Sequence, residues 1–159
     1  MILLKIIKIL VISLLTLAFS TATVAAQTFS TSCGDARFEV TKTNRGHPLD
    51  NKFSLTGRGA DGSSKVLYES EVGGWFFVSC TKRNNGQPLL LFQEFCGGSV
   101  CVEDKYGAID TSSLKIVLVP SKKNIGNWKD ASRLLGRRAP HLPSDESAFC
   151  CEIRGKIAE

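Results

Sequence analysis

Histidine is scarce in this sequence, with only His47 and His141 among 159 residues. A zinc site needs about four ligands at matched spacings, and histidine is the side chain that most often serves as a general acid or base. The chain also lacks a Cys-x-x-Cys motif, the signature of thioredoxin-like redox proteins. The sequence therefore gives no support to a metal site or a redox pair, and we predict a protein without cofactors.

A second long hydrophobic run is absent as well. The single one, Ile9–Phe19, follows Lys5 and Lys8 and precedes Val24-Ala25-Ala26, which fits a small-x-small cleavage pattern. A membrane-spanning helix needs roughly 20 mostly apolar residues, and this run becomes polar before it reaches that length. We therefore predict that residues 1–26 are a cleaved secretory signal peptide rather than an anchoring helix. The mature chain is then periplasmic or secreted, without a transmembrane segment.

No internal repeat, low-complexity segment or long linker divides the remaining chain. Residues 27–159 have the length of one ordinary domain, which can bury a hydrophobic core. All six cysteines fall in this part of the chain: Cys33, Cys80, Cys96, Cys101, Cys150 and Cys151. An even number of cysteines in an exported chain indicates disulfides. We predict a single disulfide-bonded globular domain over residues 27–159.

The stretch EFCGGSVCVED places Cys96 and Cys101 close together in sequence. Acidic residues flank the pair, and nearby negative charge disfavours the thiolate that a reactive cysteine needs. The two intervening glycines allow a tight turn. We therefore predict a local structural disulfide between Cys96 and Cys101.

Cys150 and Cys151 are adjacent in the sequence. Neighbouring residues of a strand point to opposite faces, so these two cysteines are expected to take different partners. The natural candidates are Cys33 and Cys80. We predict two long-range bridges between these pairs, and the sequence leaves their order open.

Most of the mature chain consists of short runs with period-two alternation, bounded by turn residues. Strands are predicted within residues 37–43, 51–57, 65–70, 74–95, 114–120 and 148–155. The Asn85-Gly86 dipeptide between two apolar runs is the strongest hairpin signal. A two-residue loop would place Cys80 opposite Leu91 and Phe76 opposite Phe95. One face would then carry Phe76, Val78, Cys80, Leu89, Leu91 and Phe95, and the other Trp75, Phe77 and Cys96.

One helix is predicted over NWKDASRLLG, with Asn127 as its N-cap and Gly136 as its C-terminal stop. Its apolar side is expected to bury Trp128, Ala131, Leu134 and Leu135. The sequence as a whole predicts a β-rich α+β fold stabilised by disulfides. We expect an antiparallel sheet of about five to seven short strands, as a sandwich or partial barrel, with this short helix in the C-terminal half.

Two short motifs match the patterns of known functional sites, but the residues around them favour a structural role. GRGADG at residues 57–62 matches the dinucleotide pattern Gly-x-Gly-x-x-Gly, which requires a helix immediately afterwards. A strand-like run follows instead, so a glycine-rich hairpin loop is expected. Ser112 and Lys115 match the Ser-x-x-Lys pattern of acylating serines, but Lys115 opens a strand-like run.

Acidic residues are nearly absent between residues 122 and 138, where six basic residues face only Asp130. The basic residues are Lys122, Lys123, Lys129, Arg133, Arg137 and Arg138. They form either a solvated helix face or a contact for an anionic partner, which would be an acidic envelope protein or an anionic envelope surface. Nucleic acid is not expected as a partner outside the cytoplasm.

We predict a non-catalytic binding or inhibitor protein that acts on another envelope protein. The prediction depends on the shortage of histidine, the lack of a nucleophile–base pair and the several cysteines on a compact scaffold. In size, compartment and cysteine content the chain resembles small exported bacterial proteins that bind or inhibit envelope proteins. Periplasmic lysozyme inhibitors are one such group, although no motif of theirs is matched.

Two alternatives remain open at this point. One is a small envelope hydrolase, with His47 and Asp50, or His141 with Asp145 and Glu146, as candidate catalytic groups. The other is an accessory or assembly component of an envelope or secretion machine.

Overall fold

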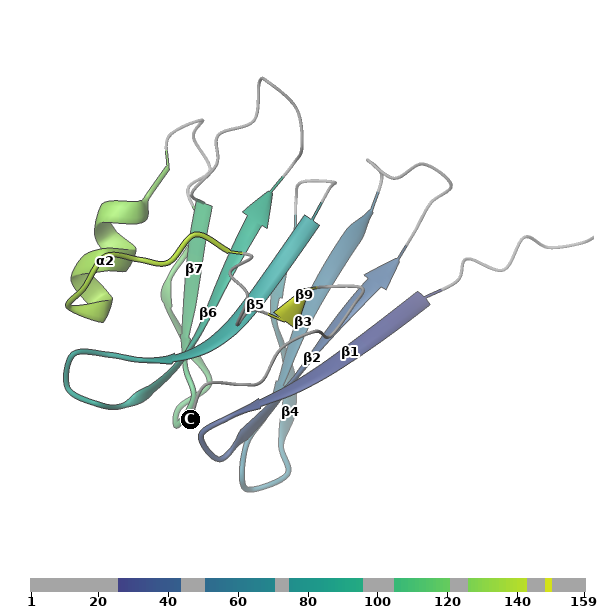
Figure 1. Ribbon diagram of the computed structural model, residues 1–159. Helices are drawn as coiled ribbons and strands as arrows, with labels where there is room; N and C mark the ends of the chain where they lie inside the picture. The colour runs from purple at the N-terminus through teal and green to yellow at the C-terminus, as the bar shows by residue number, and fades with distance from the viewer. Residues whose placement is uncertain are drawn as a thin grey trace, which may run out of the picture.

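The computed structural model describes residues 26–43, 51–70, 75–95, 105–120, 126–142 and 148–149. Two antiparallel sheets pack face to face (Figure 1). Sheet 1 has the order β1-β2-β3-β4, and sheet 2 has the order β8-β7-β6-β5-β9. The first strands are β1 (Ala26–Cys33), β2 (Ala36–Thr43), β3 (Lys52–Arg58) and β4 (Ser64–Glu69); then come β5 (Trp75–Lys82), β6 (Pro88–Phe95), β7 (Lys105–Asp110), β8 (Lys115–Leu118) and β9 (Ala148–Phe149).

The predicted fold class is confirmed: the described residues form a β-rich structure with one short helix, α2 (Trp128–Leu135). The strand number is slightly higher than expected, because β1 and β7 were not predicted. β1 is rich in serine and threonine and has little apolar alternation. The GRGADG motif forms the end of β3 and most of the β3–β4 loop, where the Gly59 N–H donates to the Ser63 carbonyl (3.0 Å), so the predicted hairpin loop is confirmed.

Aromatic rings fill the space between the two sheets. The ring of Phe76 lies 5.7 Å from that of Phe53 and 5.3 Å from that of Phe92, and Tyr68 lies 4.9 Å from Phe92. Phe53 and Tyr68 come from sheet 1, whereas Phe76 and Phe92 come from sheet 2. Burial of such large apolar side chains is the main stabilising contribution to a core of this kind.

The β5–β6 hairpin forms where the sequence predicts it, but its register differs by one residue. Cys80 pairs with Leu90 and Trp75 with Phe95, and the loop contains three residues instead of two. The Arg83 N–H donates to the Gln87 carbonyl (2.9 Å), and Gly86 adopts a φ of 82°, as in a turn followed by a glycine bulge.

A shift of one residue moves every side chain of a strand to the opposite face. Leu90 and Phe92 therefore join Phe76 and Val78 in the core between the sheets, whereas the predicted face carried Leu89, Leu91 and Phe95. These three side chains instead lie on the outer face of sheet 2, against α2 and the segment after it. Both faces of β6 are buried, so the hydrophobic pattern alone could not fix the register.

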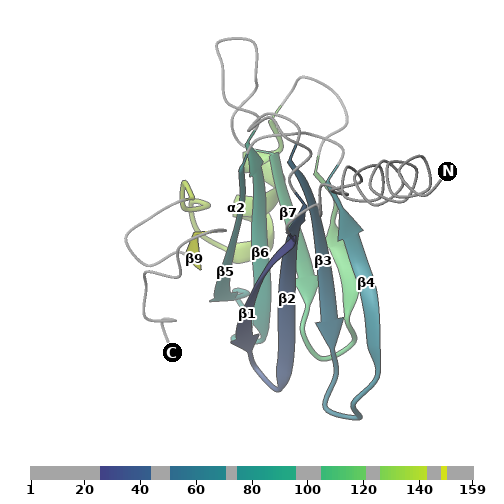
Figure 2. The same ribbon diagram turned by 90° about the vertical axis from the view of Figure 1, so that its right-hand side faces the viewer.

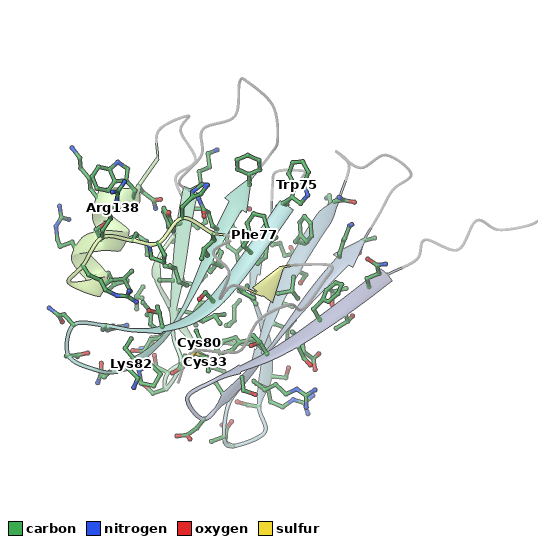
Figure 3. All side chains as sticks on the ribbon, in the orientation of Figure 1. Cys33, Trp75, Phe77, Cys80, Lys82 and Arg138 are labelled. Atoms are coloured by element: carbon green, nitrogen blue, oxygen red, sulfur yellow. A yellow bond between two sulfur atoms is a disulfide. The ribbon has the colours of Figure 1, made fainter. Side chains whose placement is uncertain are left out.

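The predicted bridges from Cys33 and Cys80 to the C-terminal cysteines are wrong, because Cys33 and Cys80 form a disulfide with each other. Cys33 ends β1 and Cys80 lies in β5, so the bond joins the two sheets (Figure 3). Their Cα atoms are 5.3 Å apart. The pairing depends on β1 lying beside β5, a contact between sheets that the sequence could not show (Figure 2).

Several predictions concern parts of the chain outside the described residues. They are the signal peptide up to Ala25, the bridge between Cys96 and Cys101, and the partners of Cys150 and Cys151. All of these stay predictions. In the described part of the chain, no helix has the length and apolarity that crossing a membrane requires.

Candidate partner-binding surface

The α2 helix lies on the outer face of sheet 2, on the side away from sheet 1 (Figures 1 and 2). It packs against this face through Ala131 and Leu135, which are both buried, and through the partly buried Leu134. These contacts confirm three of the four residues that the sequence predicted for the buried side of the helix. The remaining side of α2 faces solvent and carries charged residues.

Asn127 fixes the start of the helix through its side-chain amide. Its Oδ1 atom accepts a hydrogen bond from the Tyr106 N–H (2.7 Å), and its Nδ2 atom donates to the carbonyls of Tyr106 (2.8 Å) and Val119 (3.1 Å). Continuing the β7–β8 register would place Tyr106 opposite Pro120, which has no N–H to donate. The Asn127 side-chain amide therefore makes the hydrogen bonds with the Tyr106 backbone that a longer β8 strand would make.

This contact corrects one detail of the prediction. Asn127 occupies the N-cap position, and its carbonyl accepts from the N–H groups of Asp130 and Ala131. Its side chain, however, makes no capping hydrogen bond. The sequence indicated the position correctly, but the side chain is used to attach the helix to the sheet.

The end of the helix is held against the β5–β6 hairpin loop. Gly136 adopts a left-handed conformation with a φ of 67°, as predicted for the C-terminal stop. A Cβ atom on Gly136 would lie 2.4 Å from the Asn84 Cβ atom, so only glycine fits against this loop. The next residue, Arg137, donates from Nη2 to Thr81 Oγ1 (2.9 Å).

The segment after the helix is fixed to sheet 2 by polar contacts. The Tyr106 hydroxyl donates to the Pro140 carbonyl (2.8 Å), and the Leu142 N–H donates to Gln93 Oε1 (3.0 Å). The Ala139 N–H donates to the Ser132 hydroxyl (2.9 Å), which ties the segment back to the helix. Both ends of α2 are therefore attached to sheet 2, and these attachments fix the position of its exposed side.

Trp128 is the residue that the sequence placed wrongly. It was expected in the core, but 44% of it is exposed. The helical period aligns Trp128 with Leu135, yet Trp128 is the first residue of the helix and lies outside the contact that Ala131 and Leu135 make. The Lys129 Nζ atom lies 5.7 Å from the centroid of its ring, within cation–π range.

The predicted basic residues that the structure describes lie on α2 and directly after it, and all are exposed. We call the exposed side chains of Trp128, Lys129, Arg133, Arg137 and Arg138 the basic surface. Lys122 and Lys123, also predicted to contact a partner, lie outside the described residues. Figure 3 shows Arg138 in front of α2.

The cations of the basic surface differ in how strongly they are held. Arg133 forms an ion pair with Asp130 (2.9 Å), and Arg137 is bonded to Thr81. Arg138 makes no hydrogen bond or ion pair with any residue that the structure describes. Because Asp130 already accepts from Arg133, the cations of Lys129, Arg137 and Arg138 are not neutralised by a carboxylate of α2.

The catalytic candidates are not brought together among the described residues. His141 is exposed, and His47, Asp50, Asp145 and Glu146 lie outside the described ranges. No group of three or more histidine, cysteine and acidic residues in the described ranges could hold a metal ion. The hydrolase alternative stays a prediction.

Asp110 lies at the start of the β7–β8 turn, and its carboxylate accepts several hydrogen bonds. The Ser112 hydroxyl donates to Asp110 Oδ1 (2.7 Å), and this bond, the Ser113 N–H and the Arg83 guanidinium lower its pKa from 3.8 to about 2. Ser112 and Asp110 thus stabilise the β7–β8 turn. The Ser-x-x-Lys motif therefore belongs to a turn and the start of β8, as its strand-like context suggested.

The comparisons with known proteins give no family for this chain. No family model, no curated protein and no solved structure matches it. The basic surface is the part of the described structure on which a functional proposal can be built.

Proposed function

We propose that this protein is an exported, non-catalytic binding or inhibitor protein that recognises an acidic partner in the cell envelope through its basic surface. The exposure of Trp128 among the cations carries the proposal. A solvated helix face needs only charged side chains, and an exposed large aromatic residue has no role in it. Tryptophan and arginine are the residues most enriched where binding energy concentrates at interfaces.

The charge of the surface supports attraction of an anionic partner. Uncompensated cations on one face raise the rate of association with an oppositely charged molecule. The attachment of α2 at Asn127 and Gly136 adds to this, because groups held in place before binding lose little conformational freedom when the partner arrives. Binding would thus combine electrostatic attraction by the cations with contact to the rigidly held Trp128 ring.

The test is charge reversal at Lys129 and Arg138. These two residues are preferable to Arg133, which bonds with Asp130, and to Arg137, which bonds with Thr81. We expect Lys129→Glu/Arg138→Glu to reduce capture of acidic proteins from an envelope extract at least tenfold at low salt. The same capture by the wild type should fall as salt rises, because screening shortens the range of exposed charges to about 8 Å at physiological ionic strength.

The matched control is Lys52→Glu/Lys65→Glu, which makes the same change in net charge on sheet 1. Both lysines are exposed, and neither forms an ion pair with a described residue. Thermal unfolding should be nearly the same for both variants. Equal capture by the wild type and the Lys129/Arg138 variant would contradict the proposal.

A further inference from the structure

We propose that the basic surface docks onto an anionic phospholipid bilayer, with the Trp128 indole in the interfacial region and the surrounding cations on lipid phosphates. The inference rests on the proposed function insofar as both use the same surface. It goes further by giving the protein a place on the membrane surface, where its envelope partner would also be met.

The composition of the surface fits a bilayer interface. Tryptophan is enriched at membrane–water interfaces, because its ring is apolar and its N–H group is polar. Trp128 is 44% exposed, and the Lys129 ammonium lies over its ring, so an inserted indole would keep a cation at headgroup level. Long basic side chains reach from such a position to the phosphates.

The number of described cations in the surface is sufficient for docking on a bilayer. The surface consists of five side chains on and just after a helix of eight residues. Electrostatic docking on a lipid surface needs only a few cations, each of which raises partitioning about fivefold.

The position of α2 on the molecule also fits docking on a bilayer. α2 stands on the outer face of sheet 2, away from sheet 1 (Figure 1). Its apolar residues Ala131 and Leu135 pack on the sheet, and its charged residues are exposed. The one carboxylate on this helix, Asp130, is held by Arg133. A planar anionic surface that approaches the exposed side of α2 therefore meets no free carboxylate of the helix.

The test uses Trp75→Phe protein, which leaves Trp128 as the one remaining tryptophan of the two in the chain. Figure 3 shows Trp75 at the start of β5, away from Arg138. Vesicles of equal parts phosphatidylcholine and phosphatidylglycerol are compared with vesicles of pure phosphatidylcholine. We expect the protein to sediment with the anionic vesicles only, to lose this binding in 0.5 M salt, and to show a blue shift of its fluorescence when bound.

In the same background, Lys129→Glu/Arg138→Glu should lower partitioning by about 100-fold or more, because each reversal changes the charge by two units. Lys52→Glu/Lys65→Glu should lower it much less, and far-ultraviolet circular dichroism should show that both variants are folded. Equal loss in both variants, or binding without a change in Trp128 fluorescence, would overturn the docking surface. Failure to bind vesicles together with charge-dependent capture of an acidic protein would overturn the lipid inference and leave the proposed function intact.

Discussion

The Phe92 ring packs directly over Gly107 in the described core. Gly107 lies opposite Phe92 in the β6–β7 pairing, and a Cβ atom at Gly107 would lie 2.0 Å from the Phe92 Cζ atom. The aromatic ring thus covers the backbone of β7 directly. A glycine within a strand weakens it when nothing replaces the missing side chain, and here the ring of the neighbouring strand fills that space.

Gly107→Ala should therefore destabilise the protein by about 3 kcal/mol, at the upper end of overpacking costs. The reason is a clash with a buried ring that is itself surrounded by Phe76 and Tyr68. Denaturant unfolding of the variant measures the change. Gly86→Ala is the comparison, because it has nothing within 4 Å of the added atom and only a positive φ to oppose it; it should cost about 1–2 kcal/mol.

A double-mutant cycle makes the assignment specific. If the clash with Phe92 is the cause, Phe92→Leu should make the added methyl group of Gly107→Ala much less costly, and the two changes should not be additive. Additive effects would contradict the contact. The aromatic cluster as a whole was not predictable, because the pattern of β7 gave no strand signal and the predicted register put Leu89 and Leu91 in the core.

At the scale of elements, α2 is attached to sheet 2 by the Asn127 side chain as well as by the apolar side of the helix. An eight-residue helix is too short to be stable alone, and Ala131 and Leu135 are its only two fully buried side chains. The Asn127 amide adds three hydrogen bonds to β7 and the end of β8. The Asn127 side chain therefore holds the first turn of α2, where Trp128 and Lys129 lie.

Asn127→Asp separates the two roles that Asn127 could have. Aspartate is as good as asparagine at an N-cap, so an ordinary cap would tolerate the change. In this structure the substitution removes the Nδ2 donor and brings a carboxylate up to the Tyr106 carbonyl. We expect Asn127→Asp to destabilise the protein by about 2 kcal/mol, close to the effect of Asn127→Ala, because hydrogen bonds of partly buried groups are lost without replacement.

The measurement is chemical denaturation of both variants at neutral pH, with hydrogen exchange of the Tyr106 amide as a local probe. Faster exchange at Tyr106 in both variants would accompany loss of the attachment. A stability of Asn127→Asp equal to that of the wild type would show that the side chain acts only as a cap, and would contradict the structure.

At the scale of the whole molecule, the Cys33–Cys80 bond joins the two sheets across a sequence separation of 47 residues. The chain-entropy model gives about 4 kcal/mol for closing a loop of this length. A disulfide of this kind fits an oxidising compartment, in keeping with the predicted export. The bond also holds β1, an edge strand of sheet 1, against sheet 2.

Cys33→Ala/Cys80→Ala should therefore unfold at a lower denaturant concentration than the wild type, with a loss of about 4 kcal/mol. The loss should be smaller if the unfolded chain retains structure. Peptide mapping under non-reducing conditions should recover the Cys33 and Cys80 peptides joined to each other. Recovery of either cysteine bonded to Cys150 or Cys151 would contradict the fold.

The sequence by itself determined much of this protein at the local level. Turn residues and alternation located β2, β3, β4, the β5–β6 hairpin and β8, and Asn127 and Gly136 marked the two ends of α2. These features depend on interactions between near neighbours in the chain, which the sequence contains directly. The concentration of positive charge between residues 122 and 138 was evident for the same reason.

Only the tertiary structure decided which faces meet. The register of β6, the pairing of Cys33 with Cys80 and the exposure of Trp128 all depend on contacts between segments far apart in sequence. A strand that is apolar on both faces can be shifted by one residue without changing its pattern. An apolar residue at a helix end is buried only if a neighbouring element extends over it, and for Trp128 the described structure leaves nearly half of it in solvent. The exposure of Trp128, on which the proposed binding surface depends, was therefore evident only from the tertiary structure.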